Sequence, residues 1–204
     1  MVKNDSKKYK IIAIFNIIAM ALFVFVFIVG IRNTIYYRTH GGSPSMAFAI
    51  AAGALKLINK IGLSVFVCSL GKANKRFIAA GLMILLQAVI FFADLFITWG
   101  DGFKVLQLSS TALMVAGNYL FAAASQKAFD QIDSEIWDHW RKFKKSYLFV
   151  MIATACFGAV SYLPGIAIIG IPGFFIGCAC VLILNVLMII YMFKSAKSLN
   201  KLEA

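Results

Sequence analysis

The sequence predicts an all-α integral membrane protein, a six-helix transmembrane bundle with both termini in the cytoplasm. Apolar residues make up 62% of the 204 residues and charged residues only 14%, whereas a soluble domain is typically about 45–50% apolar and about 25% charged. The apolar residues gather in runs of about 20, the length of a helix that crosses a bilayer. Lys and Arg gather at alternate ends of these runs, the bias typical of cytoplasmic segments.

The clearest run covers residues 77–98 and carries one charge, Asp94. Lys72 and Arg76 precede it and Trp99 follows it. This is the order of a basic cytoplasmic flank and an interfacial aromatic residue. We therefore expect this helix to run from inside to outside, which orients every other run.

The first expected span covers residues 11–31, after a basic head. A cleavable signal peptide has an apolar core of about 7–15 residues, and this run is longer. We therefore expect it to be retained as a membrane span, with the N-terminus in the cytoplasm.

The second expected span, residues 46–70, carries Lys56, Asn59 and Lys60 near its middle. A central Lys costs about 2.5–3.5 kcal/mol on insertion scales. Gly53, Lys56, Lys60 and Ser64 recur at helical spacing and so share one face. We expect that face to look into the bundle or into a wet cavity.

The fourth expected span, residues 105–125, carries a polar stripe. Polar residues on one stripe of a span either bond to a neighbouring helix or line a path for a solute. The stripe consists of Gln107, Thr111, Met114, Asn118 and Ser125.

An amphipathic cytoplasmic helix is expected over residues 126–146, between spans four and five. Its first half is acidic and its second half basic, which complements a helix dipole, and apolar residues recur on one side. We expect that side to lie on the membrane surface or against a partner protein. The apolar residues are Phe129, Ile132, Ile136, Trp140 and Phe143.

The last two expected spans cover residues 147–163 and 172–193. Pro172 suits the first turn of a helix, and Gly173 and Gly177 allow close approach of a neighbouring helix. Arg32, Arg38 and Lys104 are the cations in the expected outer loops, whereas most Lys and Arg fall in the inner segments. This asymmetry favours six spans within a single transmembrane domain, residues 1–204.

A candidate intramembrane polar site combines Lys56, Lys60, Gln87, Asp94 and Asn118. Lys56 and Asp94 lie on adjacent antiparallel spans, and their side chains lean toward each other because each leans toward its own N-terminus. Pairing would lower the cost of burying both charges. The pair either holds the bundle together or belongs to a substrate or ion site.

Several function classes are disfavoured. The net charge of +12 lies at the ends of the apolar runs, which argues against nucleic-acid binding. No catalytic motif or phosphate-binding loop occurs, so we expect no enzyme, although an intramembrane enzyme is not excluded. The four cysteines lie inside apolar runs, and Glu135 and His139 form only one pair of metal-ligand type. We therefore expect no metal and no cofactor.

The expected function is transport in the cell membrane. The chain would be a small permease or the substrate-binding membrane subunit of a larger system without its own ATPase. The alternative is a non-catalytic membrane subunit or scaffold that acts through a membrane or cytoplasmic protein partner. The charged and amidic residues within the spans favour the first, and the amphipathic helix and close-packing glycines favour the second.

Overall fold

The computed structural model describes residues 2–40, 46–94, 101–160 and 167–202, and this part of the chain contains six α-helices and no strand. The expected all-α class is confirmed. The elements are α1 (Val2–His40), α2 (Met46–Ser69), a 3-10 turn η1 (Leu70–Lys72), α3 (Arg76–Asp94), α4 (Asp101–Ala128), α5 (Ser134–Val160) and α6 (Ala167–Lys201).

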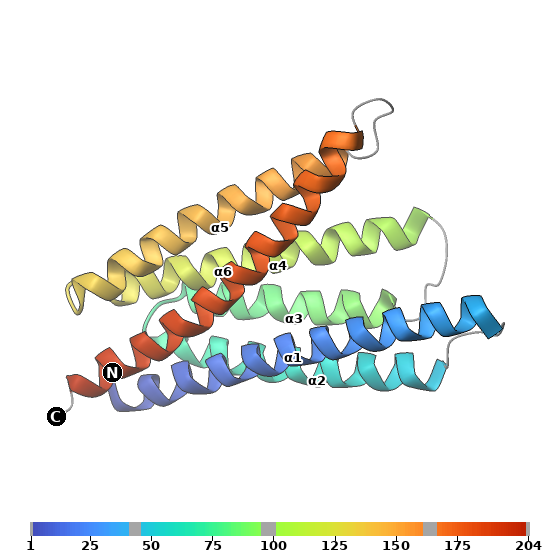
Figure 1. Cartoon of the computed structure of the whole chain (residues 1–204). Coiled ribbons are helices and arrows are strands. Elements are labelled where there is room, and N and C mark those ends of the chain that lie inside the picture. Colours follow the sequence, from blue (N-terminus) through green and yellow to red (C-terminus); the bar gives the residue numbers. More distant parts are fainter. Residues whose placement is uncertain (1, 41–45, 95–100, 161–166, 203–204) are drawn as a thin grey trace.

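The six helices form a closed ring. Each helix packs against the next helix in the chain, and α6 returns to pack against α1. Figure 1 shows both termini at the same end of the bundle, which we call the termini end, and we call the opposite end the far end. α1, α3 and α5 run from the termini end to the far end, and α2, α4 and α6 run back.

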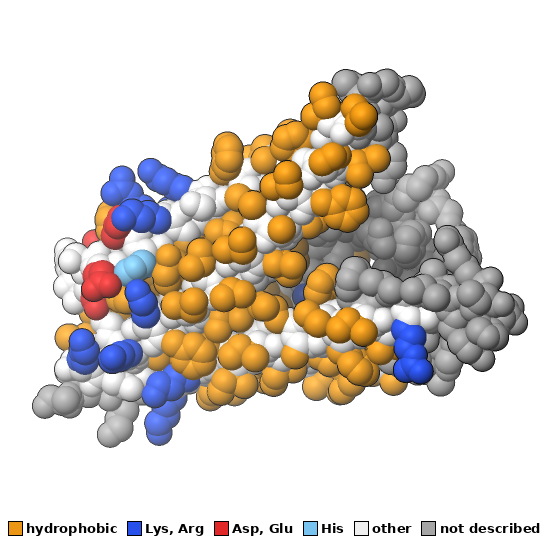
Figure 2. All heavy atoms as spheres, in the orientation of Figure 1, with side chains coloured by type: hydrophobic (Ala, Val, Ile, Leu, Met, Phe, Trp, Pro, Cys, Tyr) orange, Lys and Arg blue, Asp and Glu red, His pale blue; other side chains and the backbone are white. Residues whose placement is uncertain are grey.

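Four helices are long and apolar enough to cross a membrane. Their apolar stretches are Asp5–Val26, Ile50–Lys72, Ser134–Val160 and Ile168–Lys201, and α3 has a shorter apolar stretch, Arg76–Ile90. On the face that Figure 2 shows, apolar side chains cover the middle of the bundle, and most of the Lys and Arg side chains gather at the termini end. An apolar belt with a basic end is the surface of a membrane protein.

The packed core lies at the termini end. Tyr9 is at its centre, and its ring meets those of Phe77, Phe121 and Phe129 edge-on, with centroids 5.9 to 6.3 Å apart. Phe121 in turn meets Trp140 at 5.6 Å. Such edge-to-face pairs contribute about 0.5–1.5 kcal/mol each beyond their area burial. This aromatic cluster ties α1, α3, α4 and α5 together.

The ring opens toward the far end. Among the described side chains of α1, none after Ala13 is buried, and among those of α6 none between residues 171 and 183 is buried. Figure 1 shows the α5–α6 pair diverging from α1 in this half of the bundle. The far-end halves of α5 and α6 remain packed on each other. Gly177 of α6 lies so close to Thr154 of α5 that a Cβ on this glycine would collide with the threonine side chain.

The expected separate helix over residues 126–146 is not present. α4 continues to Ala128, a turn follows, and α5 then runs without a break from Ser134 to Val160. Gln131 in that turn has a φ of 68°, the left-handed conformation that reverses the chain after a helix. The apolar stripe is therefore divided between the turn and the first half of α5.

The stripe also has a partner within the chain. Phe129, Ile136, Trp140 and Phe143 are buried in the core, and Ile132 packs against it. The indole Nε1 of Trp140 donates a hydrogen bond to Ser195 Oγ of α6 at 2.9 Å. The stripe thus packs inside the bundle. An amphipathic pattern shows that a face is buried, but it does not show what buries it.

The first and last helices of the chain, α1 and α6, have different bounds from those expected. α1 extends from Val2 to His40, well beyond the expected span 11–31, and α6 begins at Ala167 rather than at residue 172. Pro172 therefore lies inside α6. A helix can extend beyond its membrane-crossing run when the polar residues that flank the run also favour a helix. Hydropathy therefore marks the part that crosses the bilayer and not the ends of the helix.

Candidate functional site

The centre of the candidate site is a hydrogen bond between α2 and α3. The ammonium Nζ of Lys60 donates to Gln87 Oε1 at 2.6 Å. Gln87 is buried, with 6% of its surface exposed, and Lys60 is half-buried. One turn closer to the termini end, the Ser64 hydroxyl donates to the Gly81 carbonyl at 2.7 Å. The two bonds fix the register of α2 against α3, and they bring together two of the predicted site residues.

No acidic side chain that the structure describes pairs with Lys60; the ion pairs between described side chains include Lys8–Asp5 and Lys142–Asp138. A charge in an apolar interior is costly unless it is paired. The amide of Gln87 orients the ammonium but carries no charge. The pair therefore presents a net positive charge to the interior of the bundle.

Lys56 lies one helical turn from Lys60, toward the far end, and is also half-buried. Its expected partner Asp94 is the last residue of α3, and the side chain of Asp94 lies outside the described residues. The Lys56–Asp94 pair therefore stays a prediction. Gln107 of the polar stripe also lies outside the residues whose side chains are described.

Asn118 points to a different neighbour. Its Nδ2 donates to the Tyr147 hydroxyl of α5 at 3.0 Å, so this residue joins α4 to α5. Ser125, on the same stripe, accepts a hydrogen bond from Tyr9 of α1 at 3.1 Å. Both bonds are of the interhelical kind that one alternative predicted for the polar stripe.

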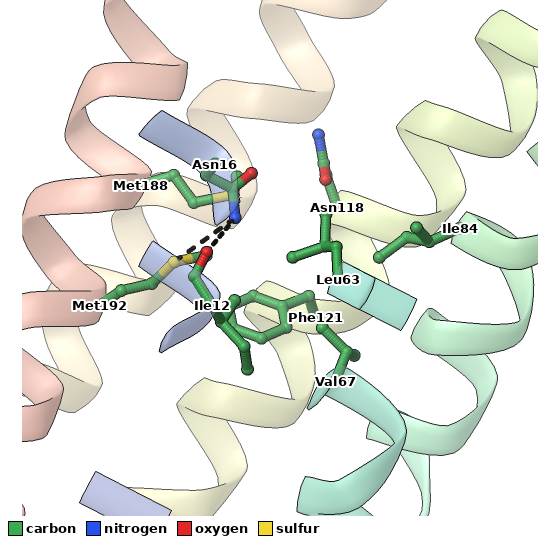
Figure 3. Close-up of a pocket in the computed structure, with 9 residues that line it drawn as sticks. All are labelled: Ile12, Asn16, Leu63, Val67, Ile84, Asn118, Phe121, Met188 and Met192. Carbon is green, nitrogen blue, oxygen red and sulfur yellow. Dashed lines mark hydrogen bonds between the residues drawn. The ribbon is translucent and has the colours of Figure 1, made fainter. Parts of the chain in front are cut away.

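Asn118 also lines a small cavity at the centre of the ring (Figure 3). The cavity has a volume of about 10 Å³, the room of a single water molecule. Figure 3 shows the Asn118 amide pointing away from Phe121 and Val67. The Asn16 amide donates to the Ile12 carbonyl at 2.9 Å. The lining residues are Ile12, Asn16, Leu63, Val67, Ile84, Asn118, Phe121, Met188 and Met192.

Two interior amides were not among the predicted site residues. Asn16 lines the cavity, and Asn59 is buried between α2 and α1, where its Nδ2 donates to the Phe15 carbonyl at 3.2 Å. Within the described part of the chain, Asn59 Oδ1 has no hydrogen-bond donor. Each is a single Asn within an apolar run of the sequence. An amide in a membrane span faces the interior of the bundle, so this pattern could have predicted both positions.

A second polar cluster closes the termini end. The Ser6 hydroxyl lies 2.9 Å from the Ala196 carbonyl oxygen, which joins α1 to α6. Lys8 Nζ donates to the Ser69 carbonyl at 2.8 Å, which joins α1 to α2. Together with the aromatic cluster these bonds seal this end of the ring.

Asp133 completes that cluster at the start of α5. Its Oδ1 accepts hydrogen bonds from the backbone N–H groups of Glu135 and Ile136, both at 3.1 Å, which is the arrangement of a helix N-cap. Its Oδ2 accepts one from the Ser198 hydroxyl of α6. The Ser198 hydrogen bond, followed by the two N–H groups, lowers the pKa of this carboxyl.

His139 has no metal-site geometry. Its Nε2 lies 3.5 Å from Lys194 Nζ of α6, and its ring is tilted against the ring of Tyr191, with centroids 4.9 Å apart. Within the described residues no group of three His, Cys, Asp or Glu side chains could hold a metal ion.

The fold defines a class, a helical membrane protein with four helices long and apolar enough to span a bilayer in its described part, and the Lys60–Gln87 hydrogen bond adds a polar pair inside the bundle. Comparison with known proteins finds no family that matches the chain, no similar curated protein and no similar solved structure. The function is therefore inferred from the residues inside the bundle.

Proposed function

We propose that this chain is a small transport-type membrane protein, a permease or a substrate-binding membrane subunit, that binds its solute beside Lys60. The observation that carries the proposal is the Lys60–Gln87 hydrogen bond in the apolar interior. An ionisable residue inside a membrane is expensive, and where one occurs it usually marks a substrate or ion path. Gln87 keeps the ammonium oriented toward the interior without neutralising it.

The proposed topology has six spans in the cell membrane, with the termini in the cytoplasm. The basic termini end supports this orientation, because Lys and Arg are enriched on the cytoplasmic side of membrane proteins. In that orientation the aromatic cluster seals the cytoplasmic side and the helices spread toward the outside. Access from one side and closure of the other is the arrangement that an alternating-access carrier adopts in one of its states.

Retention of cell metabolites tests the solute site. The purified protein, its Lys60→Met variant and a Lys197→Met control would each be incubated with aqueous and lipid extracts of cells. Lys197 is exposed on α6 at the termini end, so its replacement changes the net charge equally without touching the site. The protein and the control should retain a compound that Lys60→Met does not, as read by mass spectrometry of the eluted molecules. Equal retention by all three proteins would overturn the proposal.

The second candidate function is a non-catalytic subunit that acts through a protein partner. The observation that favours it is the small volume of the central cavity, about 10 Å³, which holds no solute larger than water. Cross-linking in membranes followed by purification would distinguish the two. A stoichiometric protein partner that Lys60→Met retains, with no retained small molecule, would favour the subunit.

A further inference from the structure

The bundle is open to the side between α1 and α6 in its far-end half. Hydrogen bonds and cavity contacts join these two helices as far as Asn16 on α1 and Met188 on α6. Beyond Asn16, no described side chain of α1 is buried. Figure 2 shows the surface hollowed between the α5–α6 pair and the α1–α2 layer. In a bilayer, this hollow would face lipid and not water.

The walls of the hollow are apolar. Side chains three, four or seven positions from a cavity-lining residue lie on the same helix face. From Asn16 this rule leads along α1 to Ala19, Met20 and Phe23, and from Met188 it leads along α6 to Leu184 and Val181. None of these side chains has a charge, and Phe23 has 52% of its surface exposed.

Lys60 lies at the inner limit of this hollow. Leu63 and Val67 of α2 line the central cavity, and Lys60 is on the same face, one turn nearer the far end. On α3, Ile84 lines the cavity and Gln87 is the next residue of that face. The ammonium group of Lys60 therefore stands where the apolar walls converge on the floor formed by the cavity residues, and the half-buried Lys56 lies one turn nearer the far end.

We propose that the ligand of this site is an anionic amphiphile that enters from the bilayer through the gap between α1 and α6. Its phosphate or carboxylate head would bind Lys60, and its hydrocarbon chain would lie along the walls of the hollow. This inference rests on the proposed solute site and names the chemical class of the solute. A small hydrophilic anion would neutralise Lys60 but leave the apolar walls uncovered, and a neutral lipid would cover the walls but leave the charge unpaired.

Native mass spectrometry of the protein in neutral detergent can test both halves of the ligand. The probes are dodecyl phosphate and dodecanoate, with butyl phosphate as the short-chain control and dodecylphosphocholine as the zwitterionic control. The long-chain anions should bind the protein and the Lys197→Met control alike. Lys60→Met should weaken their binding by at least about tenfold, the loss expected for one hydrogen bond to a charged group.

A second variant keeps the test valid if Lys60→Met folds poorly. Gln87→Glu retains the side-chain shape and gives Lys60 an internal anion, so it should stay folded and lose the long-chain anions. Long-chain binding that survives in both variants would overturn the inference, and so would absence of any long-chain binding. Butyl phosphate that binds as tightly as dodecyl phosphate, with the same dependence on Lys60, would overturn the amphiphile but leave the solute site standing.

Discussion

Lys60 and Gln87 show how one polar pair can be accommodated in an apolar bundle. The ammonium has three donors and no charge partner among the described side chains, and Gln87 Oε1 satisfies one donor at 2.6 Å. Removing Gln87 leaves the ammonium of the half-buried Lys60 without this acceptor, whereas replacing both side chains by apolar ones leaves an ordinary apolar contact. The cost of a substitution here depends on which groups are left without partners.

A double-mutant cycle should reveal this dependence. Gln87→Leu alone should lower the free energy of unfolding more than the double change Lys60→Met with Gln87→Leu does. The coupling should be about 0.5–3 kcal/mol, the range for residues in direct contact. Unfolding of the four proteins by a denaturing detergent measures it. If the two single effects simply add, the hydrogen bond does not contribute to stability.

The stability that Asp133 contributes to the folded protein should depend on pH. Its pKa is lowered in the folded protein by the Ser198 hydroxyl and by two backbone N–H groups. Its stabilisation is therefore fully present above the unfolded pKa, which is about 3.9 for Asp, and is lost as the pH falls through the lower folded value. Asp133→Ala should cost about 1 kcal/mol at pH 7, as for other N-caps.

The comparison of melting temperatures between pH 6 and pH 3 tests this. The gap between the protein and Asp133→Ala should stay constant down to about pH 4 and then shrink, since protonation removes the charge in the parent protein. Asp133→Asn retains a capping oxygen, so at pH 6 its melting temperature should lie between those of the parent protein and Asp133→Ala. A gap that is unchanged at pH 3 would show that the charge of Asp133 is irrelevant.

Residue spacing predicted which polar side chains share a helix face, but it did not predict their hydrogen-bond partners. The shared face of Gly53, Lys56, Lys60 and Ser64 follows from a period of 3.6 residues, and the Lys60 and Ser64 hydrogen bonds place this face against α3. Asn118 meets Tyr147 instead of the Lys60 pair, because its direction depends on how α4 is rotated against α5. That rotation is set by side-chain packing along the whole contact, which a hydropathy pattern does not contain.

At the scale of elements, close helix contacts depend on glycines. A Cβ on Gly81 of α3 would lie 2.9 Å from the Ser64 carbonyl oxygen of α2 and would also collide with Cys68. The backbone of α2 cannot move away without breaking the Ser64–Gly81 hydrogen bond. Gly117 of α4 is different, because a Cβ there would meet Ile84 at 3.4 Å, an ordinary contact.

Alanine at these two glycines should therefore have different effects. Gly81→Ala should destabilise the protein by about 1–3 kcal/mol, the usual cost of overpacking. By pushing α3 away from α2 it should also weaken the neighbouring Lys60–Gln87 hydrogen bond. Gly117→Ala should be close to neutral. Melting temperatures in the same detergent measure both. Equal effects of the two changes would mean that α2 and α3 separate easily, and that their spacing does not hold the site.

The turn between α4 and α5 shows the limit of sequence reasoning for elements. The apolar period over residues 126–146 was expected to face the membrane surface or a partner protein, but in the structure it packs into the core of the bundle. The chain also reverses within it at Gln131. No Gly or Pro marks that reversal. Asp133 and Ser134 do resemble a helix start, yet the acidic residues around them fitted the first half of one continuous amphipathic helix equally well.

At the scale of the whole molecule, closure of the ring is the feature that hydropathy does not predict. Alternating apolar runs imply antiparallel neighbours along the chain, and the structure has these contacts. Contact between α1 and α6 depends on small groups such as Ser6 and Ala196, which carry little hydropathy signal. Among the described side chains of α1 none after Ala13 is buried, so the contact with α6 is established at the termini end, and the proposed lateral opening lies beyond it.

We expect all six helices to cross the membrane. Six alternating helices place Ser134 on the side of both termini, and Thr39 and Gly102 on the opposite side. A cysteine at each position, in a protein whose Cys68, Cys156, Cys178 and Cys180 are replaced by Ala, would be labelled with an impermeant maleimide in intact cells. Thr39→Cys and Gly102→Cys should react from outside, and Ser134→Cys should react only after the membrane is opened.

Gly102 decides between six crossings and four. α1, α2, α5 and α6 are apolar and long enough to cross, whereas the apolar stretch of α3 is shorter. If α3 and α4 formed a hairpin that did not cross, Gly102→Cys would not react from outside while Thr39→Cys still would. The Lys60–Gln87 bond argues for crossing, because α3 must reach at least as deep as the middle of α2 to make it. Labelling of Thr39→Cys and Ser134→Cys from the same side would exclude the six-span arrangement altogether.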